Sequence, residues 1–224
     1  MRLVLLGLPG AGKGTQGDLI AERYGIPHIA SGSLIRDAVA SGSELGRAIE
    51  SYMRRGELVP DELTIDMVSE RLSRDDCAQG WILDGFPRTV RQAIALDERL
   101  AQNNLDVQMA LEIRIDPEEA IARIARRMMC SSCGAIYQFD GSGPQEETCS
   151  SCGGKLYRRV DDTEETARNR MLVYMRQTHP VVHYYSQGGR LYSIDGQRPI
   201  GEVFADVELY LRRLVNPRRV GEAR

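Results

Sequence analysis

Gly7-Leu8-Pro9-Gly10-Ala11-Gly12-Lys13-Gly14-Thr15 comes directly after the apolar run Leu3-Val4-Leu5-Leu6. The apolar run predicts a buried strand, and residues 13–24, with apolar side chains at helical spacing, predict a helix. A glycine-rich turn between a strand and a helix N-terminus directs several backbone N–H groups at one point, which suits an anionic phosphate. Lys13 adds a compact positive charge. The stretch therefore predicts a phosphate-binding loop formed by Gly10, Ala11, Gly12, Lys13, Gly14 and Thr15.

The loop departs from the usual phosphate-loop pattern at one position. Gly14 stands where serine or threonine is usual, and the hydroxyl comes one residue later, at Thr15. Direct binding of magnesium by Thr15 is therefore not predicted. The alternative interpretation is a glycine-rich turn that packs closely and binds nothing. Lys13 favours phosphate binding, because only two of the 29 basic residues are lysines, Lys13 and Lys155, and composition alone does not explain a lysine here.

The bulk composition indicates an ordinary globular protein. The 224 residues allow one substantial core with one or two small insertions, and 42% hydrophobic and 27% charged residues are usual values. A net charge of −3 favours neither nucleic acid nor an anionic membrane as partner. The first apolar run is too short for a signal peptide or a membrane span. We expect a cytoplasmic location, where the five cysteines bind metal or stay free.

Strand-like and helix-like segments alternate along the chain. Short apolar runs predict strands at 3–6, 81–83, 109–115 and 191–194, with a weaker candidate at 26–30. Helical patterns cover 13–24, 61–73, 89–101, 117–127, 164–187 and 200–214. The alternation predicts an α/β fold, a parallel β-sheet core flanked by helices on both faces, with ligands at the carboxyl ends of the strands. Asp162 and Glu165 predict a capping pair, and Pro180 predicts a break in the long helix.

Two stretches do not follow this alternation. Residues 31–59 combine Ser-Gly pairs with short helical patterns, which indicates a small inserted lobe. Residues 128–158 have almost no apolar periodicity and cannot form a core of their own, so they need a stabilising link.

Four cysteines in the second stretch can supply that link. They form the pattern C-x2-C-x15-C-x2-C at Cys130, Cys133, Cys149 and Cys152, a spacing typical of a four-thiolate zinc site. Such a site is structural, because four protein ligands leave no open position for substrate. We expect Gly134 and Gly153 to direct their backbone N–H groups at sulfur. Iron or an iron–sulfur cluster and two disulfides are the alternatives, and Cys77 reads as a buried apolar residue.

The segment Leu83-Asp84-Gly85-Phe86-Pro87-Arg88 places an acid, a glycine turn and an arginine after a buried strand. Together with Gly7–Thr15, Ser31–Arg36 and Asp161–Thr166 it resembles adenylate kinase of the long, zinc-carrying bacterial type. The resemblance extends from Met1 to about Leu214. It implies a P-loop NTPase-like core (1–30, 60–125 and 164–224), a small helical AMP-binding insertion (31–59) and a zinc-knuckle lid (126–163).

The resemblance also implies an activity and its partners. The enzyme would transfer a phosphoryl group reversibly from MgATP to AMP, giving two ADP, in adenine nucleotide homeostasis and salvage. Its cofactors would be Mg²⁺ with ATP and a structural Zn²⁺. Its partners would be ATP, AMP and ADP, without nucleic acid or membrane, and the chain would be a monomer.

Site residues follow from the resemblance position by position. ATP would contact the phosphate loop, Arg123, Arg127, the nucleoside-binding residues Ile136 and Tyr137, and the backbone of Arg198. AMP would contact Ser31, Arg36, Glu57, Leu58, Val59, Gly85, Phe86, Pro87, Arg88, Gln92, Arg159 and Arg170, with Gln92 on the adenine edge. The residues acting on the transferring group would be Lys13, Asp84, Arg88, Arg127, Arg159 and Arg170.

Several departures and alternatives accompany these assignments. Ser31 and Ser33 replace a common threonine and aspartate, and the lid begins Arg126-Arg127-Met128 instead of Gly-Arg-Arg, which leaves the role of Arg126 open. Arg123 has ordinary helical partners in Glu118 and Glu119 as an alternative to ATP. Asp84 could cap a helix instead of holding Mg²⁺ through water, and Asp161 and Asp162 could be hinge and cap residues.

The chemistry expected of such a site needs no general base. The acceptor is a phosphate that is already anionic, so positioning and charge neutralisation by arginines suffice. The three histidines, His28, His179 and His183, are accordingly expected in packing or surface roles. Rival interpretations are a kinase of another nucleoside monophosphate, a GTP-dependent AMP kinase, and a zinc-ribbon nucleic-acid binder with an NTPase core. The last lacks a basic stripe with interleaved aromatic residues, which are only 6% of the chain.

Overall fold

The computed structural model describes residues 1–139 and 148–215. The polar C-terminal end that the sequence predicts to fray, residues 216–224, lies outside the described residues. Within the described part, every helix is too short or too polar to span a bilayer.

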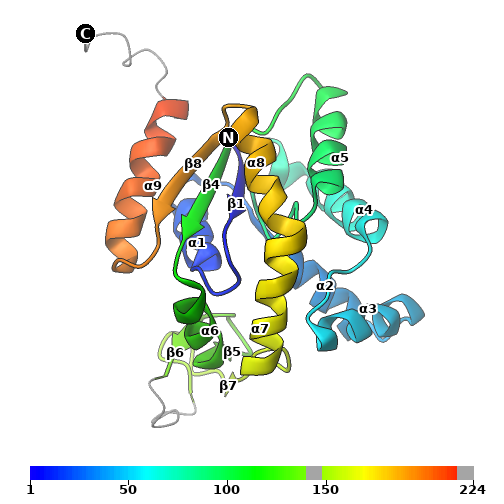
Figure 1. Ribbon diagram of the computed structural model, residues 1–224, viewed down its shortest axis with the longest axis vertical. Coiled ribbons are helices and arrows are strands. Elements are labelled where there is room, and N and C mark those ends of the chain that lie inside the picture. The colour runs from blue at the N-terminus through cyan, green and yellow to red at the C-terminus, as the bar shows by residue number, and fades with distance from the viewer. Residues whose placement is uncertain (140–147, 216–224) are drawn as a thin grey trace.

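A five-stranded parallel sheet forms the centre of the molecule (Figure 1). Its spatial order is β2–β3–β1–β4–β8. The strands are β1 (Arg2–Leu6), β2 (His28–Ala30), β3 (Trp81–Asp84), β4 (Met109–Arg114) and β8 (Leu191–Asp195). Each coincides with a predicted strand to within two residues at either end, and the predicted α/β fold with helices on both faces is confirmed.

Helices cover both faces of the sheet because successive residues of a strand point to opposite sides. In β1, Leu3 and Leu5 pack in one cluster with α1 (Lys13–Tyr24) and α9 (Ile200–Val215). Val4 and Leu6 pack in another, on the opposite face. The helices of that face are α4 (Asp61–Leu72), α5 (Val90–Ala101) and α8 (His179–Gln187). Burial on both faces explains why β1 reads as a continuous apolar run.

The predicted helix 164–187 contains an irregularity before its proline. It consists of α7 (Glu164–Val173), a π-helical turn (Tyr174–Thr178) and α8. Pro180 has no N–H to bond the carbonyl four residues earlier, within the π turn, so the irregularity precedes the proline instead of following it. The capping prediction was wrong: the Thr163 hydroxyl, and not Asp162, accepts from the Thr166 N–H and caps α7.

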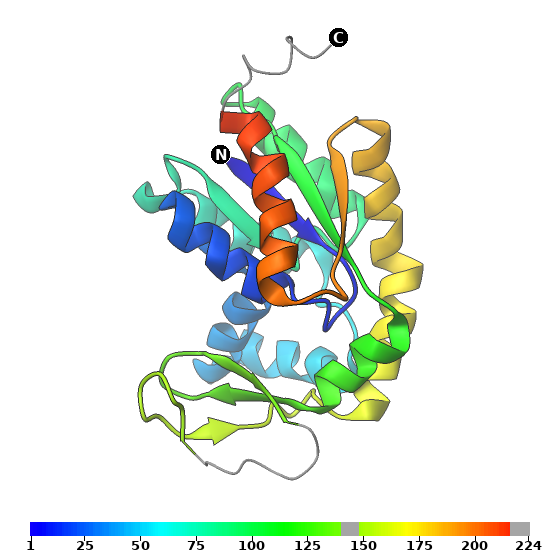
Figure 2. The same ribbon diagram turned by 90° about the vertical axis from the view of Figure 1, so that its left-hand side faces the viewer.

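Two smaller units lie at the carboxyl edge of the sheet (Figure 2). One is the helix pair α2 (Ser31–Ala40) and α3 (Glu44–Arg55). The other is an antiparallel sheet of order β6–β5–β7, with β5 (Arg127–Cys130), β6 (Ile136–Gln138) and β7 (Leu156–Tyr157). This second sheet begins directly after α6 (Pro117–Ala125), so the predicted helix 117–127 ends earlier than expected, and Arg127 belongs to a strand.

Candidate active site

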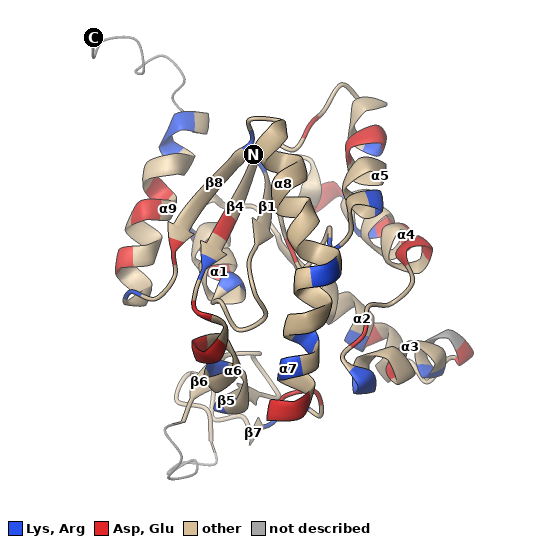
Figure 3. Ribbon diagram, viewed as in Figure 1, with Lys and Arg blue, Asp and Glu red and all other residues tan. Residues whose placement is uncertain are grey.

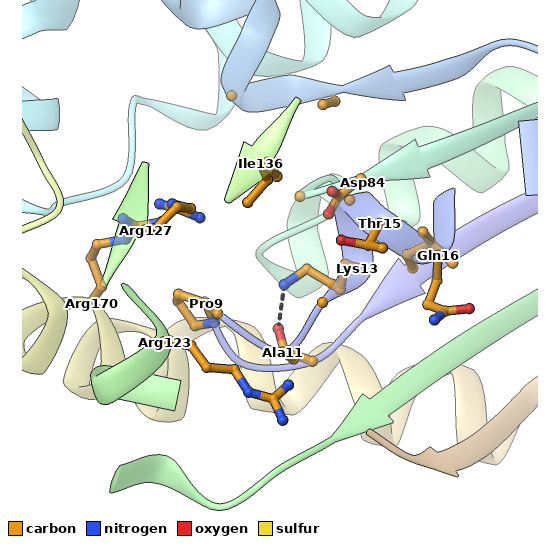
Figure 4. A pocket seen from close by; sticks show the side chains of 18 of the residues that line it. Pro9, Ala11, Lys13, Thr15, Gln16, Asp84, Arg123, Arg127, Ile136 and Arg170 are labelled. Carbon is orange, nitrogen blue, oxygen red and sulfur yellow. Dashed lines mark hydrogen bonds between the residues drawn. The ribbon is translucent and has the colours of Figure 1, made fainter. Parts of the chain in front are cut away.

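A cleft of about 890 Å³ opens at the carboxyl edge of the parallel sheet. The phosphate loop, the end of β3, the α2–α3 helix pair, the small sheet and α7 all contribute to its lining. Figure 4 shows Lys13 and Asp84 on one side of this space and Arg127 and Arg170 on the other. Segments distant in the sequence therefore place charged side chains around a single volume.

The phosphate loop has a positive φ at Gly7, Gly10 and Gly12, and at the first two a side chain would also meet neighbouring backbone. Gly7 has φ of +133° and Gly10 has φ of +85°, values that residues with a side chain rarely adopt. A Cβ at Gly7 would lie 2.3 Å from the Ile113 carbonyl oxygen, and one at Gly10 would lie 2.6 Å from that of Ala120. The loop is thus packed directly on β4 and α6, which fixes the direction of its backbone N–H groups at the N-terminus of α1.

Lys13 lies across this loop. Its Nζ donates to the carbonyl oxygens of Gly7 and Leu8, both at 2.9 Å. Burial lowers the pKa of Lys13 from the usual 10.5 to about 8; Asp84 opposes this shift, and Arg88, Arg170 and Arg127 add to it. A cation that shares a dry cleft with three other cations is stabilised by an anionic ligand.

Asp84 ends β3 beside a histidine that sequence reasoning placed elsewhere. His28 was expected in a packing or surface role, but it lines the cleft, its Nδ1 2.7 Å from Asp18 Oδ1 and its Nε2 3.7 Å from Asp84 Oδ2. Burial alone would lower the pKa of His28, but the two carboxylates outweigh it and raise the pKa to about 9. Burial would likewise raise the pKa of Asp84, yet His28 and Lys13 hold it below its usual range.

The Asp84 carboxylate faces open space at the phosphate loop. Thr89, and not Asp84, caps α5, so the alternative capping role does not occur. A Cβ at Gly14 would lie 3.7 Å from Asp84 Oδ2, an ordinary contact distance, so the start of α1 lies directly beside this carboxylate. An ionised oxygen ligand beside a polyphosphate loop suits a hydrated Mg²⁺.

A second group of predicted residues lies beside α2 and the β3–α5 loop. The Ser31 hydroxyl and the Arg88 Nε both donate to the Gly85 carbonyl oxygen, at 2.6 and 2.7 Å. The residues of this group that line the cleft are Arg36, Glu57, Leu58, Val59, Gly85, Pro87 and Arg88. Ser31, Phe86 and Gln92 are each at most 2% exposed and lie behind that lining.

Lid and helix arginines meet buried acids that sequence analysis assigned to a hinge and a cap. Arg127 forms a two-point ion pair with Asp162, with Nε 2.7 Å from Oδ2. Arg170 Nη1 lies 3.1 Å from Asp161 Oδ2 and 3.6 Å from Asp162 Oδ1. The Asp162 side chain is completely buried. The two aspartates therefore orient two arginines toward the cleft.

Positive charge exceeds negative charge in this space. Figure 3 shows basic residues on α2 and α7, two helices that border the cleft. Burial and the neighbouring guanidinium groups lower the pKa of Arg88 and of Arg159 to about 10, and that of Arg170 also falls. Such mutual repulsion is relieved when an anion with several negative oxygens enters.

Of the two residues of β6 predicted to contact the nucleoside, only one lines the cleft. Ile136 lines the cleft, whereas the Tyr137 hydroxyl lies on the cysteine cluster, 3.1 Å from Cys149 Sγ and 2.9 Å from Ser150 Oγ. Neighbouring residues of a strand point to opposite faces, so only one of them can face a nucleotide with its side chain. Arg123 also lines the cleft, where it donates to Glu119 at 2.7 Å and to the Gly196 carbonyl oxygen at 3.2 Å.

Arg198 and Gln16 lie at the end of the cleft near α9. Sequence reasoning did not assign a role to Gln16. Arg198 lines the cleft, and its side chain pairs with Asp206. Gln16 is 3% exposed, and its Nε2 donates to the Ile200 carbonyl oxygen at 3.1 Å. Gln16 follows the phosphate loop directly in sequence, but only the fold brings it to residues 184 positions away.

The four cysteines of the small sheet gather at one point. The Sγ atoms of Cys130, Cys133, Cys149 and Cys152 all lie within 4.8 Å of one another. A tetrahedral zinc site needs sulfur atoms about 3.8 Å apart, so the cluster fits such an ion. The backbone N–H groups of Ser132 and Cys133 point at Cys130 Sγ, at 3.3 and 3.5 Å.

The glycines of this cluster have another role than the one predicted. Gly134 and Gly153 donate to the carbonyl oxygens of Cys130 and Cys149, at 3.1 and 2.8 Å, and not to sulfur. Their φ values of +74° and +72° close each Cys-x2-Cys turn in the left-handed region. Cys77 is buried, as predicted, and none of the cysteines in the described part forms a disulfide.

Comparison with known proteins gives a consistent result. A family model described as adenylate kinase matches residues 5–190. A protein of Archaeoglobus fulgidus named adenylate kinase is 47% identical over 215 residues, 96% of this chain and 99% of that protein. Proteins of the same name are 49% identical over 208 residues in a Geobacillus species (92% and 96%) and 47% identical over 215 residues in Methanocella arvoryzae (96% and 100%).

The buried acid beneath the arginines gives a stability prediction. Replacing Asp162 with asparagine leaves Arg127 and Arg170 without their shared carboxylate, so we expect a loss of about 3 kcal/mol in the free energy of unfolding. Urea unfolding followed by circular dichroism measures it. Glu119→Gln, which removes the half-exposed partner of Arg123, is the matched control and should leave the midpoint unchanged. Equal midpoints for both variants would contradict the orienting role of Asp162.

Proposed function

The chain belongs to the adenylate kinase family, whose reaction is phosphoryl transfer between MgATP and AMP to give two ADP, and we propose which of its residues carry each part of that reaction. The observation on which the proposal rests is the convergence of the phosphate loop, Lys13 and the arginines on one cleft of about 890 Å³. A volume of this size admits two nucleotides side by side, with their phosphates in the cationic centre.

The donor, ATP, is assigned to the phosphate-loop side. The amides of Gly10 to Thr15 and the Lys13 ammonium would hold the β- and γ-phosphates. Arg123 and Ile136 would contact the nucleoside, and the backbone of Arg198 the adenine. Tyr137 would support this region through the cysteine cluster instead of by direct contact, because its hydroxyl already lies on Cys149 and Ser150.

The acceptor, AMP, is assigned to the side of α2 and the β3–α5 loop. Arg36 and Arg88 would bind its phosphate, and residues 57–59 would line the adenine pocket. Ser31 would act through the Gly85 carbonyl that it already bonds, which holds the loop of Arg88 in place. Gln92 would present its amide to the adenine edge, and Phe86 would support the loop from the core.

The chemical step would depend on positioning and charge neutralisation. The acceptor phosphate is an anion, so no group needs to remove a proton from it. Arg88, Arg127, Arg159 and Arg170 would surround the transferring group, and cationic groups of this kind contribute about 10³–10⁵ in rate. Mg²⁺, when bound to ATP, adds further charge neutralisation, and Asp84 would hold it through water. Closure of the small sheet over the cleft would exclude water that could otherwise accept the phosphoryl group.

We also propose the division of the chain into parts. Residues 1–30, 60–125 and 164–224 would form the core, 31–59 the AMP-binding lobe and 126–163 the lid, whose four thiolates would bind a structural Zn²⁺. The Cys133 backbone N–H and the Tyr137 hydroxyl lower the pKa values of Cys130 and Cys149 respectively. At Cys152 the Gly154 backbone N–H lowers the pKa, but the neighbouring thiols outweigh it and raise the pKa to about 12, so four thiolates together would need the charge of a metal cation. The enzyme would act as a cytoplasmic monomer on small molecules, and its net charge of −3 argues against nucleic acid or membrane partners.

Replacing Lys13 with methionine tests the assignment of the donor site. Methionine has a side chain of similar length but lacks the positive charge that would bind the β- and γ-phosphates. We therefore expect kcat/KM to fall at least about 10²-fold. A coupled assay of AMP-dependent ADP formation measures it. Lys155→Met, which removes the only other lysine, is the control and should retain full activity. Intact turnover in Lys13→Met would refute the proposal.

The lowered pKa of Lys13 makes ATP binding depend on pH. The ammonium form binds the phosphates, and the free enzyme loses this proton as the pH rises through about 8. Affinity should therefore be constant below that value and fall about ten-fold per pH unit above it, with uptake of a proton on binding. Titration calorimetry in buffers of different ionisation enthalpy measures both. Lys13→Arg keeps its charge throughout this range and should bind without the decline.

The cysteine cluster gives a metal-dependent prediction. Because four thiolates leave no place for substrate, Cys130→Ser should lower the thermal unfolding temperature much more than it lowers turnover at moderate temperature. Differential scanning calorimetry of the zinc-loaded wild type and variant measures the first quantity. A chelator should shift the wild type in the same direction and have little further effect on the variant. An unchanged unfolding temperature would remove the structural role.

A further inference from the structure

A carboxylate at the start of α4 holds the side chain of a buried glutamine. Asp61 Oδ1 accepts from Gln92 Nε2 at 2.7 Å, and Asp61 Oδ2 accepts from the Thr89 hydroxyl at 2.9 Å. Gln92 Oε1 in turn accepts from the Arg88 backbone N–H at 2.7 Å. Gln92 is 1% exposed, so these bonds are shielded from water. The network joins α4, α5 and the loop that carries Arg88.

These partners permit only one orientation of the Gln92 amide. An ionised carboxylate only accepts hydrogen bonds, and a backbone N–H only donates. If the amide turned over, its oxygen would face Asp61 and its NH₂ would face the Arg88 N–H, so two bonds would become two repulsive contacts. The Arg88 backbone N–H fixes the position of the amide oxygen, and Asp61 fixes the position of the amide NH₂.

The Gln92 amide keeps one hydrogen-bond donor and one acceptor free for a ligand. A primary amide offers two donors and two acceptor lone pairs, and Asp61 and the Arg88 N–H use one of each. One N–H and one lone pair remain. Adenine presents an amino donor beside a ring-nitrogen acceptor on its Watson–Crick edge, which matches this pair. Guanine presents a carbonyl acceptor beside a ring N–H donor, the reverse arrangement, which matches only the turned amide.

We propose that Asp61 is a positioning residue that makes the acceptor site select adenine over guanine by fixing the orientation of the Gln92 amide. Both carboxylate oxygens of Asp61 are already bonded, one to Thr89 and one to Gln92, so Asp61 acts through Gln92 and not by touching the nucleotide. The inference rests on the proposed contact between Gln92 and the adenine of AMP. It extends that contact, because an unrestrained glutamine could read either base.

Replacing Asp61 with asparagine tests the inference, because an amide at 61 can donate or accept and so removes one of the two restraints on Gln92, leaving only the Arg88 N–H. Initial rates with AMP and with GMP as acceptors, at saturating ATP, give the ratio of the two kcat/KM values. We expect this ratio to fall about ten-fold or more, with KM for ATP unchanged. Since the ratio comes from one preparation, a smaller folded fraction cancels. If asparagine does not give folded protein, Asp61→Ser removes the fixed acceptor equally and should shift the ratio in the same direction.

Glu62→Gln is the matched control. It removes the neighbouring carboxylate of the same first helical turn, one that pairs with Arg91 at the surface, and should leave the ratio unchanged. An unchanged ratio in Asp61→Asn, or an equal fall in Glu62→Gln, would overturn the inference.

Gln92→Leu separates this inference from the proposed function. If Gln92 reads the base, Gln92→Leu lowers the ratio by itself, and adding Asp61→Asn lowers it no further. If Gln92→Leu lowers the ratio but Asp61→Asn does not, the contact with adenine stands and the positioning role of Asp61 fails. If Gln92→Leu leaves the ratio unchanged, Gln92 does not read the base and both fail.

Discussion

Repulsion among cations that share one cleft is the constraint on which the site depends. Lys13, Arg88, Arg159 and Arg170 all have lowered pKa values, caused first by burial. Such a group is stable in the folded chain only because Asp84, Asp161 and Asp162 are placed among it. The acids compensate part of this charge, and the cleft between them keeps an excess of basic side chains.

The architecture was largely predictable because its signals are local. A strand buried on both faces is a continuous apolar run, as in β1, and a phosphate loop needs glycine where φ is positive, as at Gly7 and Gly10. The cysteine spacing likewise predicted a cluster that the fold brings together. The assignment of the family followed from motifs whose residues stand next to one another in the sequence.

The supporting residues were not predictable, because the fold alone brings them together. Asp61 lies 31 positions from Gln92, and the Gln16 contact spans 184 positions. Asp162 illustrates the same limit: its place before a helix indicated a cap, yet burial beside Arg127 and Arg170 determines its role. His28 belonged to a weak three-residue strand, and only the position of that strand beside β3 brings it to Asp84.

The π turn at Tyr174–Thr178 joins α7 and α8 into one long helical rod and changes the helical register between them. A π turn holds one residue more than an α turn, which rotates everything beyond it by about 100°. On one side of it, Met171 and Tyr174 pack beneath the phosphate loop; on the other, Val181 and Tyr185 pack against the opposite part of the sheet. The surplus residue therefore turns the apolar stripe of α8 relative to that of α7, so one rod packs on the sheet at one end and carries Arg170 to the cleft at the other.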